Sequence, residues 1–317
     1  MAGNRIVLGK GLLAAAVLLA AVLLSGTCFA SETEEIKITD MTGREIVLDK
    51  PAESIIALSA ADCENLYAVG AGDLLVGRGE YCDYPEQVLD LPVVQSGANT
   101  NLEEILALEP DVLLMSTMAQ SKEQIEALES KGVKVVVSDA MDIDGVYTSL
   151  AILGAMTGHE DEAAAVTEDM KATFKELEEK AAEINEPKSV YFEVSPLEYG
   201  LWTAGKETFM NEISDMIGLK NCFEEVSGWA AISEEQVLEK NPDVIVTITM
   251  YFGEGPTPAE EISGRNGWDQ ITAVKDGAIL NLQHDELSRP ATRLADGARM
   301  LFDFVYGEET AEEQEAA

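Results

Sequence analysis

NLEEILALEPDVLLMS, residues 101–116, and SEEQVLEKNPDVIVTI, residues 233–248, share one pattern. Each begins with a residue that favours a helix N-cap, continues with the apolar spacing of a short helix, and reaches Pro-Asp before a run typical of a buried strand. The two stretches align without a gap, at an offset of 132 residues from 101 to 233. This echo predicts two α/β lobes built on one plan. Chance similarity between two common βαβ units is the alternative.

The first turns of these two predicted helices carry matched residues. Both have the spacing of a capping box, in which the N-cap side chain and a side chain three residues later bond each other's backbone. The pairs are Asn101–Glu104 and Ser233–Gln236. Glu103 and Glu235 also occupy equivalent positions. They either complement the helix dipole or form a matched pair of exposed carboxylates, one per lobe, that meets two basic sites on a partner.

The rest of the chain alternates strand-like and helix-like segments, which predicts parallel sheets. A hairpin is expected at residues 36–48, with Thr42-Gly43 in its turn. The predicted strands are 54–58, 74–76, 112–115, 133–137, 190–194, 243–249 and 278–282. The predicted helices include 121–130, 207–217 and 290–304.

A long helix is expected between the two lobes. From Asp144 to Ile184 no strand signal occurs, and a first helix ends near Gly158. A second runs from Glu160 to Ile184 with a regular apolar stripe, and about 25 residues at a rise of 1.5 Å give a rod of about 37 Å. We therefore expect two Rossmann-like lobes joined by a single long α-helix, with the ligand cleft between them. The expected parts are 1–30, a signal peptide; 31–142, the amino-terminal lobe; 143–186, the linking helices; 187–307, the carboxy-terminal lobe; and 308–317, a disordered acidic tail.

Residues 1–30 have the layout of an export signal: two bases, an apolar run from Leu12 to Leu24, and small residues at the end. The run is shorter than the roughly 20 residues of a spanning helix, which favours a cleaved signal over a membrane anchor. Cleavage after Ala30 and lipidation at Cys28 both remain open. Either places the mature protein in the periplasm or at the cell surface.

Composition excludes several classes of function. Lys and Arg number 21 against 59 Asp and Glu, for a net charge of −38, so neither nucleic acid nor an anionic membrane is a favourable partner. Two His are too few for a His-rich metal site. The chain has no phosphate-binding loop of the NTPase type and none of the serine or zinc hydrolase motifs that we sought.

Three cysteines remain after the signal: Cys63, Cys82 and Cys222. They form no C-x-x-C motif, and an odd number does not make a disulfide framework. We expect free buried thiols, with pairing of Cys63 and Cys82 in an oxidising compartment as the alternative.

Aromatic and polar side chains gather in the segments that follow predicted strands. Ligands of open α/β sheets bind beyond the carboxyl ends of the strands, so these segments are candidate contacts. The candidates are Tyr81, Tyr84, Tyr199, Trp202, Trp229, Tyr251, Phe252, His284, Asp285 and Arg289. Taken singly, each aromatic is more often a packing residue than a ligand contact. Asp285 or Ser288 is alternatively the cap of the last helix, with Arg289 as a surface base.

The chain resembles the extracytoplasmic substrate-binding proteins of ABC importers for cobalamin, ferric siderophores and haem. The resemblance covers roughly residues 36–306 and rests jointly on several motifs. They are ITDMTGREIVL, GEYCDYP, NLEEILALEPDVLL, SGW with ISEEQVLEKNPDVIV, and SRPATRLADGARML. It implies two α/β lobes joined by one rigid helix, a cleft that holds the ligand, and one Glu per lobe that pairs with arginines of the permease dimer. Glu103 and Glu235 match those two positions.

GEYCDYP and SGW look most like the cobalamin receptors of this family. That likeness implies corrin contacts from Tyr81 and Trp229, an aromatic contact from Trp202, and polar contacts from Asp285 and Arg289. Ser59 and Tyr251 complete the expected ligand set. Gly97 and Ser116 stand where cobalamin receptors have Trp, so ferric siderophores and haem stay open. For haem, Tyr81 or His284 is the candidate axial ligand.

The sequence thus predicts a non-catalytic, monomeric receptor without an intrinsic cofactor. Its expected ligand is a metal chelate: a corrinoid first, with a ferric siderophore or haem as the alternatives. Its expected partner is an ABC permease dimer with cytoplasmic ATPase subunits. The alternative class is an extracellular hydrolase, because the large number of Asp and Glu residues is compatible with a pair of catalytic carboxylates like that of glycosidases.

Overall fold

The computed structural model describes residues 35–97, 100–117 and 122–307. The predicted signal with Cys28, and the predicted acidic tail, lie outside these residues. Within them, no helix has the length and apolar character needed to span a membrane.

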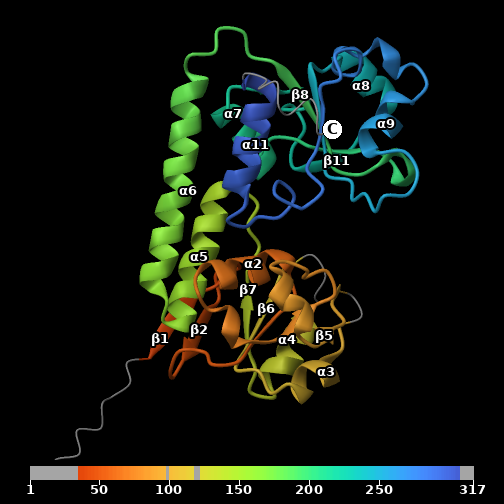
Figure 1. Cartoon of the computed structure of the whole chain (residues 1–317). Helices are drawn as coiled ribbons and strands as arrows, with labels where there is room; N and C mark the ends of the chain where they lie inside the picture. The colour runs from red at the N-terminus through yellow and green to blue at the C-terminus, as the bar shows by residue number, and fades with distance from the viewer. Residues whose placement is uncertain (1–34, 98–99, 118–121, 308–317) are drawn as a thin grey trace, which may run out of the picture. The chain divides into compact units, whose positions relative to one another are not determined.

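The first part of the described chain forms a five-stranded parallel sheet, in the order β5-β4-β3-β6-β7. We call this sheet and its helices the amino-terminal lobe (Figure 1). The strands are β3 (Ile55–Ala57), β4 (Leu75–Gly79), β5 (Val93–Val94), β6 (Val112–Met115) and β7 (Lys134–Val137). The helices are α2 (Ala60–Ala68), α3 (Leu102–Ala107) and α4 (Lys122–Glu129), with 3₁₀ turns η1 (Gly72–Leu74) and η2 (Glu86–Asp90). The predicted hairpin precedes them as β1 (Ile36–Thr39) and β2 (Glu45–Leu48), paired antiparallel.

The second part forms a four-stranded parallel sheet, in the order β10-β8-β12-β13. We call it and its helices the carboxy-terminal lobe. The strands are β8 (Ser189–Glu193), β10 (Lys220–Asn221), β12 (Val244–Thr247) and β13 (Ile279–Asn281). The helices are α7 (Phe209–Met216), α8 (Glu234–Lys240), α9 (Pro258–Ser263), α10 (Thr272–Lys275) and α11 (Leu294–Tyr306), with 3₁₀ turns η4 (Leu197–Tyr199) and η5 (Trp268–Gln270). Two parallel sheets with flanking helices confirm the predicted α/β class.

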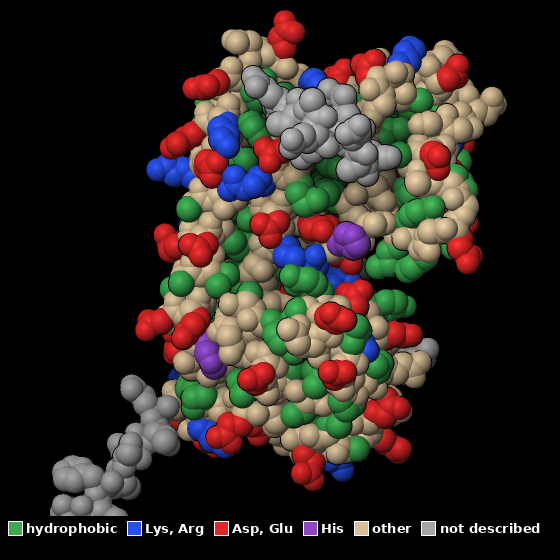
Figure 2. Space-filling model, viewed as in Figure 1, with side chains coloured by type: hydrophobic (Ala, Val, Ile, Leu, Met, Phe, Trp, Pro, Cys, Tyr) green, Lys and Arg blue, Asp and Glu red, His purple; other side chains and the backbone are tan. Residues whose placement is uncertain are grey.

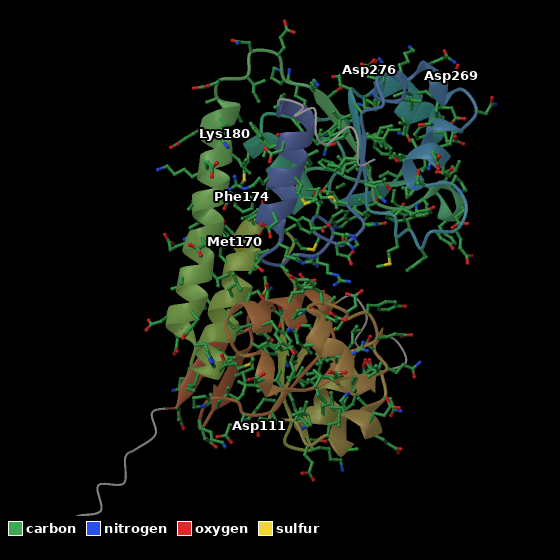
Figure 3. All side chains as sticks on the ribbon, viewed as in Figure 1. Asp111, Met170, Phe174, Lys180, Asp269 and Asp276 are labelled. Atoms are coloured by element: carbon green, nitrogen blue, oxygen red, sulfur yellow. The ribbon has the colours of Figure 1, made fainter. Side chains whose placement is uncertain are left out.

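The repeated Pro-Asp motif has the same structural role in both lobes. Asp111 Oδ2 accepts the backbone N–H of Ser54 at 3.1 Å, and the Ser54 hydroxyl accepts the N–H of Asp111 at 2.9 Å. In the other lobe, Asp243 Oδ2 accepts the N–H of Ser189 at 2.8 Å, and the Ser189 hydroxyl accepts the N–H of Asp243 at 3.0 Å. Each aspartate therefore fixes the start of its own strand against the start of the neighbouring strand. Figure 3 labels Asp111 in the amino-terminal lobe.

The two repeated helices also end alike but begin differently. Glu109 and Asn241, one residue before each Pro-Asp, have positive φ of 50° and 46°. At the helix starts, Ser233 and Gln236 form the complete capping box. The Asn101 side chain accepts two backbone N–H groups, but Glu104 accepts from Gln95 N at 3.4 Å, so the reciprocal arm predicted for that box is wrong.

The linking segment is a pair of helices, α5 (Ile143–Thr157) and α6 (Glu160–Ala181). Gly158, with φ of 75°, ends α5 as predicted. The long helix has 22 residues, about 33 Å at 1.5 Å per residue, and ends three residues before the predicted Ile184. It contacts α5, α7 and α11, and buries Met170 and Phe174 (Figures 1 and 3).

Two further expectations need correction. The last helix was expected to begin near Pro290, with Asp285 or Ser288 as its cap, but α11 begins at Leu294 after Arg293. Residues 282–293 form a loop instead, because their polar side chains are engaged in ion pairs and hydrogen bonds. The sequence predicts Trp202 and Trp229 in loops, but they belong to β9 (Trp202–Ala204) and β11 (Trp229–Ala231), which pair antiparallel. Three-residue strands are too short to show a period in sequence.

Candidate functional site

A cleft of about 850 Å³ lies where the two lobes face each other. Its walls come from the segments after β6, β7, β8 and β12, from the start of α2, and from the loop before α11. The lining residues are Ser59, Ala60, Ala61, Ser116, Thr117, Ser138, Asp139, Ala140, Met141, Val194, Ser195, Trp202, Phe209, Met210, Trp229, Ile248, Ser288, Arg289 and Pro290. The cleft therefore lies at the carboxyl ends of parallel strands, where α/β sheets bind ligands.

The carboxy-terminal wall of the cleft is aromatic and apolar. Trp229 packs edge-on against Phe209, with 5.4 Å between ring centroids. Trp202 is 42% exposed, and Met141, from the facing segment after β7, is 43% exposed. Large apolar side chains that stay exposed inside a cleft lose their contact with water when a flat apolar ligand enters.

The amino-terminal wall combines small apolar side chains with hydroxyl groups and a carboxylate. Ser59 caps α2 by accepting the N–H of Asp62 at 3.1 Å, and its hydroxyl donates to Asp62 Oδ2 at 2.8 Å. Burial raises the pKa of Asp62 to about 6, against the opposing effect of hydrogen bonds from Ser59 and Ser138, and the nearby charge of Asp139 adds to the rise. Asp139 also accepts a hydrogen bond from Thr117. This wall offers hydroxyl groups and a carboxylate to a ligand.

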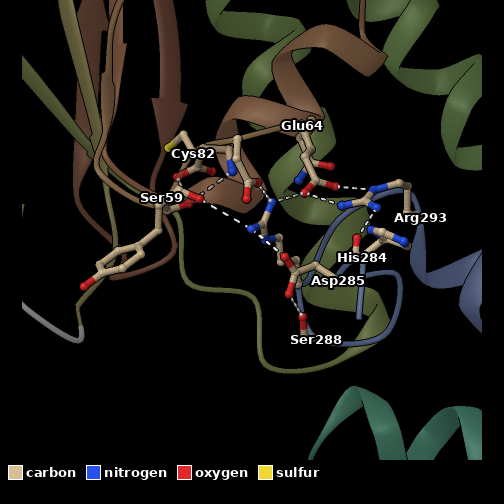
Figure 4. Close-up of polar contacts among 12 residues, drawn as sticks. Ser59, Glu64, Cys82, His284, Asp285, Ser288 and Arg293 are labelled. Atoms are coloured by element: carbon tan, nitrogen blue, oxygen red, sulfur yellow. Dashed lines mark hydrogen bonds and ion pairs between the residues drawn. The ribbon is translucent and has the colours of Figure 1, made fainter. Parts of the chain in front are cut away.

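Arg289 borders the cleft, but carboxylates already hold its guanidinium; two of them, Glu64 and Asp285, are labelled in Figure 4. Nη1 lies 2.9 Å from Glu64 Oε1 and 2.7 Å from Asp83 Oδ1, and Nη2 lies 2.6 Å from Asp285 Oδ2. Burial alone lowers the pKa of Arg289, but hydrogen bonds to Asp83 and Glu64 outweigh it and raise the pKa above its ordinary value. The arginine is therefore neutralised by the protein itself.

Glu64 and Asp83 belong to the amino-terminal lobe, while Arg289 and Arg293 belong to the carboxy-terminal lobe, so this network ties the lobes together. Arg293 binds Glu64 at two points and lies over the ring of Tyr84, 4.0 Å from its centroid. On the face seen in Figure 2, acidic side chains are spread over both lobes, and one group of basic side chains lies at their junction.

A second cavity, of about 670 Å³, is lined by different residues. It takes Asp83 and Tyr84 from one lobe, and Met250, Tyr251, Phe252 and residues of the 283–300 region from the other.

The predicted ligand residues divide between these two cavities. Ser59, Trp202, Trp229 and Arg289 line the cleft. Tyr251, His284 and Asp285 line the second cavity. Tyr81 is 73% exposed and lines neither; its carbonyl accepts from Arg289 Nη2 at 3.4 Å. The structure thus brings four of the predicted contacts into one cleft and leaves the others beside it.

The sequence analysis did not identify several polar residues of the cleft. Thr117, Asp139 and Ser195 line it, and each follows a buried strand within two residues. The signal that identifies them is a polar side chain directly after a buried strand, where ligands of α/β sheets bind.

The predicted docking residues are both exposed, in the first turns of α3 and α8. Hydrogen bonds from its own backbone and from Ser233 lower the pKa of Glu235. Among residues 35–97, 100–117 and 122–307, no group of three His, Cys, Asp or Glu is placed to hold a metal ion. The three cysteines there are free thiols; Cys63 and Cys82 are buried and Cys222 is half-buried.

Comparisons with known proteins agree with this architecture. A model of the periplasmic binding protein family matches residues 55–286. The uncharacterized ABC transporter substrate-binding lipoprotein YvrC of Bacillus subtilis (strain 168) is 33% identical over 308 residues, covering 92% of this chain and 96% of the relative. The vitamin B12-binding protein of Yersinia pestis (strain Pestoides F) is 32% identical over 199 residues, covering 62% of this chain and 69% of the relative.

Among solved structures, a possible iron-binding (periplasmic solute-binding) protein from Staphylococcus epidermidis ATCC 12228 is similar. It shares 31% identity and a TM-score of 0.67, covering 81% of this chain and 100% of that chain.

Proposed function

Because the chain belongs to the periplasmic binding protein family, as a substrate-binding component of ABC importers, we propose that it captures a corrinoid in the interlobe cleft and delivers it to a permease. The family performs transport rather than catalysis. A relative over nearly the full length is a substrate-binding lipoprotein, and one of lower coverage binds vitamin B12. The proposed location is extracytoplasmic, in keeping with these relatives.

The observation that carries the choice of ligand is the composition of the cleft wall. One side presents Trp202 and Trp229, which suit the face of a planar ring. The other side presents the hydroxyls of Ser59, Thr117 and neighbouring residues, which suit the amide side chains around a corrin ring.

Charge also favours a ligand without carboxylates. Of the described residues that line the cleft, Arg289 is the only Lys or Arg, and Glu64, Asp83 and Asp285 already neutralise it. Asp139 adds a negative charge to the wall. Haem propionates and catecholate siderophores bring anionic groups that would be desolvated here without a free cation, which is costly.

A ferric chelate is the second candidate, because a solved structure similar to this chain is a possible iron-binding protein. Haem is the third: His284 lines the second cavity and is exposed, so it is the candidate axial ligand.

The test is a ligand panel: cyanocobalamin, cobinamide, a ferric hydroxamate, a ferric catecholate and haemin. We expect the corrinoids to co-elute with the protein on gel filtration and to quench its tryptophan fluorescence. Binding of a ferric chelate or haemin alone would move the assignment to that class. Turnover of glycoside or ester substrates, abolished by one carboxylate substitution, would instead favour a hydrolase.

A further inference from the structure

Cys63 and Cys82 lie together in the amino-terminal lobe. Cys63 is on α2 and Cys82 is in the loop after β4, and both are fully buried. Their Sγ atoms approach the same acceptor, the carbonyl oxygen of Ala57, at 3.8 Å and 3.6 Å. Two buried thiols that lie around one backbone oxygen are candidates for a disulfide.

The residues that follow these two cysteines in the chain bind an arginine of the opposite lobe. Glu64 follows Cys63 and Asp83 follows Cys82. These two carboxylates are the acceptors that hold Arg289 Nη1 from the opposite lobe, at 2.9 Å and 2.7 Å. Each cysteine is therefore the immediate chain neighbour of one of the two carboxylates that bind Arg289 Nη1.

We propose that Cys63 and Cys82 form an intramolecular disulfide in the exported protein, and that this bond fixes the two carboxylates that hold Arg289. The oxidant is a disulfide, either glutathione disulfide or a protein thiol oxidant, as exported proteins encounter outside the cytoplasm. The two Sγ–H bonds break, one Sγ–Sγ bond forms, and the two electrons and two protons reduce the oxidant's disulfide to two thiols. This inference does not depend on which ligand the cleft binds.

The bond is expected to form during folding rather than afterwards. Both thiols are inaccessible in the folded lobe, and the hydrogen bond to Cys82, together with burial, raises the pKa of Cys63 well above its ordinary value. Because the thiolate is the attacking species, a folded reduced pair reacts slowly. Cys222, half-buried in the other lobe, is the matched control.

The test refolds the reduced, unfolded full chain in a mixture of reduced and oxidised glutathione. Free thiols are then alkylated, and unreduced peptides are mapped by mass spectrometry. We expect a linked peptide pair that contains Cys63 and Cys82, with two hydrogen atoms fewer than the separate peptides. Cys63→Ser or Cys82→Ser abolishes it, and Cys222→Ser leaves it intact. Alkylation of both residues in the wild type, or a linkage through Cys222, would overturn the proposal.

Two further readouts test the consequence for the lobe. Closing a loop of this length should raise the melting temperature of the oxidised wild type by roughly 5 °C over the reduced form, with no difference for the Cys63→Ser/Cys82→Ser double variant. Amide hydrogen exchange of residues 79–85 should slow on oxidation. If residues 79–85 exchange at the same rate in the oxidised and reduced protein, the disulfide does not fix the carboxylates that bind Arg289. The wild-type measurements stand even if the double variant fails to fold.

Discussion

Glu64 and Arg293 form a two-point ion pair across the junction of the lobes: Nε donates to Oε2 at 2.8 Å and Nη2 donates to Oε1 at 2.7 Å. Glu64 also receives Arg289, and its side chain is only 1% exposed. One buried carboxylate therefore pairs with two arginines from the opposite lobe, which makes it the centre of the interlobe contact.

Replacing Glu64 by Gln should destabilise the protein strongly. The substitution leaves two arginines at the junction without their shared anion, and breaking one partner of a buried pair costs about 3–5 kcal/mol. Urea unfolding at pH 7 measures the loss. The matched control is Glu176→Gln, because Glu176 pairs with Arg299 on an exposed surface, where ion pairs contribute little. Equal losses of unfolding free energy for the two substitutions would show that the interlobe network stabilises the protein no more than an exposed ion pair does.

Replacing Trp202 by Ala should weaken corrinoid binding about tenfold, because the ligand loses a ring that it would cover. Equilibrium dialysis with cyanocobalamin, followed by corrin absorbance, avoids the confounding change in protein fluorescence. Tyr199→Ala is the control: Tyr199 is 76% exposed and precedes the first residue of the same strand by three positions, 199 against 202. Should Trp202→Ala bind as tightly as the wild type, the aromatic wall does not receive the ring.

The buried carboxyl of Asp62 predicts a pH dependence of stability. Its folded-state pKa of about 6 lies above the ordinary 3.8, so the folded protein binds this proton more tightly than the unfolded chain does. The ionised form thus carries a penalty that is fully present above pH 6 and is relieved as the pH falls from about 6 to 3.8. A shift of this size corresponds to up to about 3 kcal/mol.

Asp62→Asn removes that penalty and keeps an acceptor for the Ser59 hydroxyl. We expect the variant to be more stable than the wild type at pH 7, with the difference in unfolding free energy shrinking towards pH 4. Asp269→Asn, at an exposed position, is the control. A difference that stays constant between pH 7 and pH 4 contradicts the assignment of the raised pKa to Asp62.

The elements with regular periods could be predicted from sequence, and the irregular ones could not. The strand at Val112–Met115 and the end of α5 at Gly158 fall where the pattern places them. A four-residue apolar run after Pro-Asp, and a glycine after an apolar helix, are local signals. The ribbon of Trp202 and Trp229 has no such signal, because its pairing is set by tertiary contacts between segments 27 residues apart, from 202 to 229.

The site was predicted in part for the same reason. Sequence identifies Arg289 as a polar residue after a strand, but it does not show that Glu64 and Asp83, 225 and 206 residues away, already hold it. Ion pairs between the lobes depend on how the lobes pack against each other, and this packing is seen only in the structure. The GEYCDYP motif predicts Tyr81 as a contact; its side chain is exposed and lines neither cavity, so this contact stays a prediction.

The last prediction concerns docking to the permease. Glu103 and Glu235 are exposed at equivalent helix starts, one in each lobe, and a two-fold permease presents the same basic patch twice. Charge reversal by Glu103→Arg or Glu235→Arg should abolish most transport, because like charges then face each other at the interface. Ligand affinity of the isolated receptor should not change, since neither residue lines the cleft.

Glu239→Arg, an exposed position at the other end of α8, is the control for net charge. Uptake of labelled ligand in cells and equilibrium dialysis of the purified variants separate the two effects. Normal uptake by both reversed variants, or loss of uptake by Glu239→Arg as well, would mean that general charge steering rather than this matched pair guides the receptor to its permease.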